Sequence, residues 1–326
     1  MKKLFCRVLA LALCAVMLTL PAAAATDDLL ISPAPAPAAQ LSPVRVWGRA
    51  TRLEGGSLFL QNSDADDPNR EIIVHLSETT PVVDAVTGLP LDAAEIKDGD
   101  TVYAWVGPAM TMSLPPQSTA SVVVANIPAD GEVPQYYEIS GPDQTVTIAI
   151  YPAPPRTEVN LPTAGGEVLR IPVTAKISPW LTKNIVTLDD LTPGTRVLVW
   201  RDSAKTVNRV LVLGNDYRGY LSWYPGGAVF VNGEALSVVG KVVDGEVLLP
   251  IRAVAEAAGY TVAWEPGKGA VVTDSGAEVF AVLPGASLVQ TADGGQGLSA
   301  PCVFEAGATY LPAADLAFLL NLYPSL

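Results

Sequence analysis

The stretch LLPIRAVAEAAGYTVAWEP, residues 248–266, decides the fold of the C-terminal third of the chain. Its pattern predicts a strand that ends at Pro250 and a short helix that stops at Gly259, because proline is tolerated in the first helical turn and glycine favours a helix end. One face of this helix is apolar. That face comprises Ile251, Val254, Ala255 and Ala258. A helix this short is marginal alone in water, so we expect it to pack on a sheet.

The same order of strand, proline and helix recurs in YLPAADLAFLLNLYP, residues 310–324. Upstream of both copies, AVFVNGEALSVV is typical of a β-hairpin, because Asn232-Gly233 suits a type I′ turn between two apolar strands. We therefore expect residues 217–326 to form one α+β domain, an antiparallel sheet with short helices, in which the two halves share a core.

Three of these segments resemble the copper amine oxidase N-terminal-like domain, a small sheet-and-helix stalk module. They are VNGE at 231–234, the stretch at 248–266 and YLP at 310–312. The resemblance covers about residues 229–323 and implies an exported bacterial protein of the Gram-positive kind. In the first half, the matching positions are Pro250, Arg252, Gly259 and Trp264.

The second half departs from the family pattern. When the two prolines are aligned, Arg252, Glu256 and Gly259 stand opposite Ala314, Phe318 and Asn321. A role that the family gives to a second arginine is therefore not implied for this chain.

The resemblance does not imply oxidase activity. Copper amine oxidases hold copper with three histidines and make their quinone cofactor from a tyrosine in an Asn-Tyr-Asp/Glu setting, whereas this chain has one histidine and no Asn-Tyr dipeptide. A generic copper or zinc site needs several imidazoles or thiolates, and the mature chain offers His75 and Cys302. We expect no metal, no cofactor and no copper amine oxidase activity.

Residues 1–25 have the pattern of a signal peptide. A basic start precedes the apolar run Val8–Leu20, which is shorter than the ~20 residues of a membrane span, and small residues for cleavage follow at Ala22–Ala25. Lipidation at Cys14 is not expected, since the leucine before it fits a lipobox badly. We expect a protein that is secreted or associated with the cell wall, with Cys302 as the one thiol of the mature chain and no internal disulfide.

The chain is acidic, with a net charge of −13. The leader removes three basic and no acidic side chains, which leaves 17 basic against 33 acidic residues and a mature charge of −16. Nucleic acids and anionic lipids bind to clustered Lys and Arg. This charge balance therefore argues against both partners, and we expect no membrane insertion after cleavage.

Two β-rich modules precede the α+β domain. After a Pro/Ala-rich linker at 26–43, short runs of β-branched and aromatic residues alternate with turn formers over 44–127 and again over 134–213. EIKDGDTVYAW, residues 95–105, and DLTPGTRVLVW, residues 190–200, occupy equivalent places. The fold class expected is mainly β and multi-domain: two tandem small β-barrel or OB-like modules, then the α+β stalk-like module.

Several polar groups are candidate sites. For His75 we expect a half-exposed strand histidine, because no Ser or Cys nucleophile motif accompanies it. The loop at 64–69 offers an oxygen cluster for calcium or a solvated hairpin tip, and it lacks the EF-hand spacing. The neighbouring Asp189 and Asp190 point apart, so they are not a paired acid and base. Arg252 and Glu256 are spaced to pair on the helix, and the loop at 110–118 can cap the barrel or meet a partner.

Aromatic residues gather where the α+β domain begins. The stretch NDYRGYLSWYPGG, residues 215–227, contains Tyr217, Tyr220, Trp223 and Tyr224. Aromatics at a module boundary commonly pack the modules together, whereas a glycan-binding protein would use them for stacking on sugar rings. The candidate ligand-binding residues are Tyr220, Trp223 and Tyr224.

These observations predict a non-catalytic binding or structural protein, secreted or associated with the cell envelope. The expected partner is cell-wall polysaccharide or an envelope protein. The alternative is an extracellular glycan hydrolase or accessory module with a site built from scattered carboxylates. No catalytic residue is identified, because no nucleophile with a base, no metal cluster and no phosphate-binding glycine loop is evident.

Overall fold

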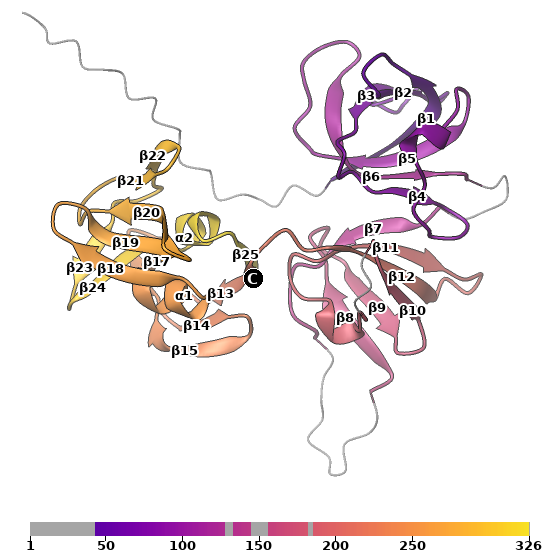
Figure 1. The fold of residues 1–326 in the computed structure, drawn as a ribbon. Coiled ribbons are helices and arrows are strands. Elements are labelled where there is room, and N and C mark those ends of the chain that lie inside the picture. Colours follow the sequence, from indigo (N-terminus) through magenta and orange to yellow (C-terminus); the bar gives the residue numbers. More distant parts are fainter. Residues whose placement is uncertain (1–42, 128–132, 145–155, 182–184, 326) are drawn as a thin grey trace, which may run out of the picture.

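A computed structural model describes residues 43–127, 133–144, 156–181 and 185–325. The predicted leader and nearly all of the predicted linker lie outside the described residues. Strands dominate the described chain, which falls into three groups of elements: an N-terminal barrel (β1–β6), a middle module (β7–β12) and a C-terminal domain (β13–β25 with α1 and α2) (Figure 1). The predicted multi-domain, mainly β fold is confirmed.

The N-terminal barrel is a closed five-stranded sheet. Its strands are β1 (Val44–Arg52), β2 (Leu58–Gln61), β3 (Glu71–His75), β4 (Val82–Asp84), β5 (Thr101–Val106) and β6 (Gln117–Ala125), with the 3-10 helix η1 (Ala93–Glu95) before β5. The order β3-β2-β1-β5-β6 closes because β3 also pairs with β6, in parallel, and β4 adds to the far end of β6. Alternating apolar side chains of these strands, such as Val46, Leu60 and Val74, fill the interior.

The middle module repeats this plan. Its strands are β7 (Gln135–Glu138), β8 (Glu158–Pro162), β9 (Val168–Pro172), β10 (Lys176–Pro179), β11 (Arg196–Arg201) and β12 (Val207–Gly214), with η2 (Leu188–Asp190) before β11. The pairings β7–β11, β11–β12 and β10–β12 correspond to β1–β5, β5–β6 and β4–β6. The turn glycines Gly99 and Gly194 both have positive φ, +89° and +88°. The sequence repeat is therefore a repeat of topology.

The middle module differs from the barrel in its closure. Among the described residues, the β8–β9 hairpin forms its own two-stranded sheet, joined to the end of β7 by the single bridge Ile139–Thr163. Apolar side chains hold the hairpin against β11 and β12 in one core. The hairpin side chains in that core are Val159, Leu161, Leu169 and Ile171. Hydrophobic packing thus holds the β8–β9 hairpin in the middle module, whereas continuous strand pairing holds the strands of the N-terminal barrel together.

Equivalent faces of the two repeats pack against each other. Figure 1 shows β4 and β6 beside β7 and β11, and a shared cluster of buried residues fills this contact. It contains the two tryptophans of the repeat, Trp105 and Trp200, and the ring of Trp105 meets that of Tyr136 with centroids 6.1 Å apart. Strands β5, β6, β11 and β12 are therefore covered on both faces, which explains why runs such as VVVA in β6 lack polar alternation.

The C-terminal domain contains three sheets and two short helices. Its strands are β13 (Gly219–Trp223), β14 (Ala228–Val231), β15 (Glu234–Val239), β16 (Lys241–Val243), β17 (Glu246–Pro250), β18 (Thr261–Glu265), β19 (Gly269–Asp274), β20 (Ala277–Val282), β21 (Leu288–Thr291), β22 (Gly294–Gly297), β23 (Val303–Glu305), β24 (Ala308–Pro312) and β25 (Leu322–Ser325). The helices are α1 (Ile251–Ala257) and α2 (Ala313–Leu319). The sheet orders are β15-β14-β13-β25, β16-β17-β24-β23 and β18-β19-β20-β21-β22.

The two predicted strand-and-helix halves meet at the centre of this domain. Strands β17 and β24 pair antiparallel, and each ends in the proline that precedes its helix. Helix α1 ends before Gly259, with φ +85°, and α2 ends before Asn321, with φ +49°. Asparagine tolerates this left-handed conformation, so the departure from glycine keeps the geometry of the helix end. The predicted type I′ turn is present too, with positive φ at Asn232 and Gly233.

Helix α2 buries a carboxylate. Asp315 is 2% exposed, and its Oδ2 accepts hydrogen bonds from the backbone N and Oγ of Ser299 at 2.7 and 2.8 Å. Its Oδ1 has no hydrogen-bond partner. Burial raises the pKa of Asp315, and the two Ser299 bonds offset this only partly. The ionised carboxylate is therefore less stable in the folded chain than in the unfolded chain.

Replacing Asp315 by asparagine is expected to remove a pH dependence of stability. Because the folded pKa is raised, the native free energy of unfolding falls as pH rises from the usual Asp value of 3.8 through the folded pKa. The variant should lack this fall and melt at a higher temperature than the native chain at neutral pH. Thermal melts over the acid-to-neutral range test this, with the exposed Asp293→Asn as control; parallel curves for the native chain and Asp315→Asn would contradict it.

Candidate functional site

A groove lies on the C-terminal domain between edge strands of two sheets. Strands β18, β23 and β24 and the start of α1 enclose a volume of about 410 Å³. Trp264 and Phe304 line it, each 52% exposed, with ring centroids 5.9 Å apart and ring planes at 46°. We call this the Trp264–Phe304 groove.

The edge positions of β18 and β23 explain why these rings are exposed. Val262 and Trp264 are two residues apart and share a face of β18, but Val262 reaches the core whereas Trp264 lies beyond it. Phe304 stands on β23 opposite Thr309. Pro250 and Ile251 also line the groove, so a mostly apolar surface holds two flat rings open to solvent.

Arg252 brings hydrogen-bond donors to the groove. Its Nη1 donates to Glu256 Oε1 at 2.9 Å and to the carbonyl oxygen of Val262 at 2.7 Å. The predicted helix pair of Arg252 and Glu256 is confirmed, and the second bond ties the guanidinium to β18. Three of the positions that carry the family resemblance line the groove, namely Pro250, Arg252 and Trp264.

The lining of the groove is mainly apolar and carries the charged side chain of Arg252. Its lining residues include no Asp, Glu, His or Cys. Across the described ranges, no group of three or more such side chains is placed to hold a metal ion. Cys302 is buried, and burial raises the pKa of its thiol to about 11, so it stays protonated near neutral pH. No helix within the described ranges is long and apolar enough to cross a membrane.

The aromatic residues predicted to bind ligand do not form one platform. Tyr220 and Trp223 are three residues apart on β13 and face opposite sides of the sheet. Trp223 packs against the core, and Tyr224, 63% exposed, meets Phe230 edge-on at 6.2 Å. Tyr217 contacts Tyr323 instead. Their role in ligand binding stays a prediction.

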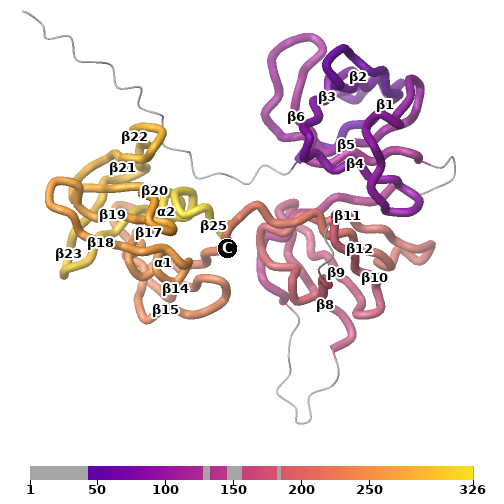
Figure 2. The backbone as a smooth tube through the Cα atoms, viewed as in Figure 1, coloured from indigo at the N-terminus to yellow at the C-terminus, as the bar shows by residue number. Residues whose placement is uncertain are grey.

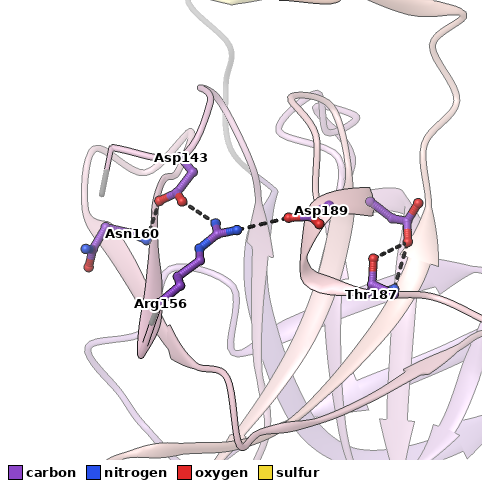
Figure 3. Close-up of polar contacts among 6 residues, drawn as sticks. Asp143, Arg156, Asn160, Thr187 and Asp189 are labelled. Carbon is purple, nitrogen blue, oxygen red and sulfur yellow. Dashed lines mark hydrogen bonds and ion pairs between the residues drawn. The ribbon is translucent and has the colours of Figure 1, made fainter. Parts of the chain in front are cut away.

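Asp189 and Asp190, which are expected to point apart, bond to different partners. Figure 3 shows Arg156 between Asp143 and Asp189, and its Nη1 donates to Asp189 Oδ1 at 2.9 Å. Asp190 Oδ2 instead accepts bonds from the N and Oγ1 of Thr187 at 2.7 and 2.9 Å. These bonds fix η2 and the adjacent segments of the backbone. The two carboxylates do not face each other as an acid and base pair.

His75 has a serine partner that the sequence did not reveal. It is half-exposed on β3, as expected, but its Nδ1 lies 2.8 Å from Ser57 Oγ and its Nε2 lies 2.9 Å from Gln117 Oε1. A neutral amide cannot stabilise an imidazolium as a triad carboxylate does. The three side chains instead link the residue before β2 with β3 and β6, where the barrel closes.

Two loops of the N-terminal barrel are candidate sites from the sequence. In the loop at 64–69, Asp64 and Asp67 accept hydrogen bonds from the backbone N–H groups of Asp66 and Asn69, as in Asx turns. The loop between β5 and β6 stands away from the barrel (Figure 2). At its tip, Met112 and Leu114 are fully solvent-exposed, whereas Met110 packs on the barrel core.

The sequence alone does not predict the groove. In the sequence, Trp264 stands out only as a position of family resemblance, and Phe304 lies in a segment without a distinctive pattern. The signal available was a tryptophan at the end of a short strand, next to Glu265 and a turn. Its partner ring is 40 positions away, so only the packing of two sheets brings them together.

Comparison with known proteins agrees with the C-terminal architecture. A search of curated proteins found no match to this chain. Residues 230–322 match the family model described as the copper amine oxidase N-terminal domain, a domain that is non-catalytic in those enzymes. This range holds both strand-and-helix halves and the Trp264–Phe304 groove. Over residues 230–322, the C-terminal part of the chain is therefore similar to the copper amine oxidase N-terminal domain.

Proposed function

We propose that this chain is a non-catalytic exported protein that binds cell-wall polysaccharide in the Trp264–Phe304 groove. The observation that carries the proposal is the pair of half-exposed rings in a groove of about 410 Å³, beside the donor groups of Arg252. Flat aromatic faces pack on the apolar faces of sugar rings, and arginine N–H groups donate to sugar hydroxyls. The open groove suits an extended chain.

The composition of the groove favours binding over hydrolysis. Glycoside hydrolases place two carboxyl groups about 5–9.5 Å apart across the scissile bond. The residues that line the groove include no carboxylate, and the nearby Glu256 is paired with Arg252. This supports the non-catalytic reading over the alternative of a glycan hydrolase.

Loss of either ring is expected to weaken binding to insoluble wall polysaccharide. Stacking on an aromatic side chain is worth ~1–3 kcal/mol in nucleic-acid complexes, and a similar value here gives a loss of about fivefold or more for Trp264→Ala and for Phe304→Ala. A pull-down at several polysaccharide concentrations measures the change. Both side chains are half-exposed, so both variants should keep the fold.

Trp223→Ala and Tyr224→Ala are the matched aromatic variants. Native-like binding by these two, with loss in the groove variants, supports the groove. If Trp223→Ala or Tyr224→Ala loses polysaccharide binding while the groove variants bind as the native chain does, the binding site lies at the start of the domain instead. If the native chain does not bind polysaccharide, the proposal fails and an envelope protein becomes the partner class.

A further inference from the structure

A second pocket lies where the N-terminal barrel meets the middle module, far in the sequence from the groove. Its volume is about 320 Å³, and β1 and β5 contribute to it from one side and β7 and β11 from the other. The side chains that matter are Arg45, Tyr103, Gln135, Arg201 and Lys205. We propose that this pocket binds a carboxylate-bearing saccharide, with the carboxylate on the arginines and a sugar ring on the neighbouring aromatic surface. This site is separate from the proposed function.

The first argument is the positive charge of two arginines in an acidic chain. The chain carries a net charge of −13, yet three cationic side chains line this pocket. Within the described residues, neither Arg45 nor Arg201 forms an ion pair. By contrast, carboxylates neutralise Arg156, Arg196, Arg218 and Arg252. A local cluster of this kind attracts small anions even when the whole molecule repels polyanions.

The second argument is the aromatic surface beside the cations. Trp47 and Tyr103 are paired neighbours on β1 and β5, and their rings stack with centroids 5.9 Å apart and planes at 16°. The guanidinium of Arg45 lies over the Tyr103 ring at 5.8 Å. Both rings are half-buried, and Tyr103 lines the charged pocket. A sugar ring can pack there while its carboxylate reaches a guanidinium.

The third argument is that the Arg201 side chain and the turn that carries Lys205 are held in place. Arg201 donates to Tyr137 Oη and to the carbonyl oxygen of Lys205, both at 3.2 Å. The turn that carries Lys205 is fixed by Asp202, whose Oδ1 accepts the backbone N–H groups of Ala204 and Thr206 at 2.9 and 3.0 Å. The partners of Arg201 are neutral, so its charge remains available to a ligand. Prepositioned donors lower the entropic cost of binding.

Calorimetric titration of the full chain with a linear trimer of galacturonic acid tests the proposal. The matched neutral probe is the same trimer with its carboxyl groups methyl-esterified. Hydrogen bonds to charged groups are worth about 1.5–3 kcal/mol, so the ester should bind at least about tenfold more weakly. Arg45→Gln and Arg201→Gln should each cost about tenfold for the acidic trimer. The matched control is Arg170→Gln, an exposed arginine of β9 outside the pocket, which should bind as the native chain does.

Three outcomes would overturn the proposal. Equal binding of the acid and its ester would remove the carboxylate from recognition. Inorganic phosphate that binds as tightly as the trimer would make the pocket a simple anion site, and absence of trimer binding by the native chain would refute the ligand class. Trp264→Ala should leave trimer binding unchanged, so failure here is distinguishable from failure of the groove proposal. Thermal melts of each variant confirm that the fold is intact.

Discussion

Replacing Trp200 by alanine is expected to lower the free energy of unfolding by about 3–5 kcal/mol, the usual cost of truncating a buried tryptophan. Trp200 is 7% exposed, and its Nε1 donates to the carbonyl oxygen of Ala85 at 2.7 Å. Its ring lies under the guanidinium of Arg209 at 4.1 Å, which in turn donates to the carbonyl oxygens of Val86 and Thr87. The substitution leaves a cavity and a buried carbonyl without its donor.

Urea unfolding followed by circular dichroism measures the loss, and hydrogen exchange locates it. Backbone amides of the segment after β4 should lose protection, because this segment docks on Trp200 and Arg209. Trp264→Ala is the matched control, since that ring is half-exposed and supports no contact between modules. Equal loss of stability in the two variants would show that the Trp200 contact does not couple the barrel to the middle module.

The repeat that contains Trp200 could be recognised in the sequence, but the contact between modules that Trp200 forms could not. Glycine turns and period-two strands fix each module locally, which is why strands, hairpins and the two tandem modules could be predicted. The sequence placed Trp105 and Trp200 at equivalent strand ends. It did not show that both tryptophans pack into one contact between the two modules. Which outer faces meet depends on side-chain packing between strands that lie far apart in the sequence. The continuous apolar run in β6 was the available hint.

The candidate sites were less predictable than the fold, for the same reason. A site built within one segment, such as the Arg252–Glu256 pair, follows from helix spacing. Trp264 with Phe304, and Arg45 with Arg201, come from different strands, and no spacing rule joins them. Conversely, Tyr220 and Trp223 are close in sequence yet lie on opposite faces of one strand. Nearness in sequence was a poor guide to a shared surface.

Replacing Tyr323 by alanine is expected to have a similarly large effect, about 3–5 kcal/mol by analogy with other buried aromatics. Tyr323 is fully buried on β25, which pairs in parallel with β13. Its ring meets Tyr217 edge-on at 5.1 Å, and its side chain hydrogen-bonds Glu138 of β7. One residue near the end of the described chain thus joins the C-terminal domain to the middle module. Urea unfolding measures the loss.

Tyr323→Phe isolates the hydroxyl and adds a pH signature. Burial raises the pKa of Glu138 above its usual 4.5, while the bond from Tyr323 lowers it. The native free energy of unfolding therefore falls as pH rises from 4.5 through the folded pKa of Glu138. Without the hydroxyl that pKa rises further, so the fall continues to higher pH. The free energies of unfolding of the variant and the native chain should be most similar in acid, where Glu138 is protonated. Near neutral pH the variant should be less stable than the native chain. Thermal melts from about pH 3 to about pH 8 test this; a constant difference between the two curves would show that the hydroxyl does not act on the Glu138 carboxylate.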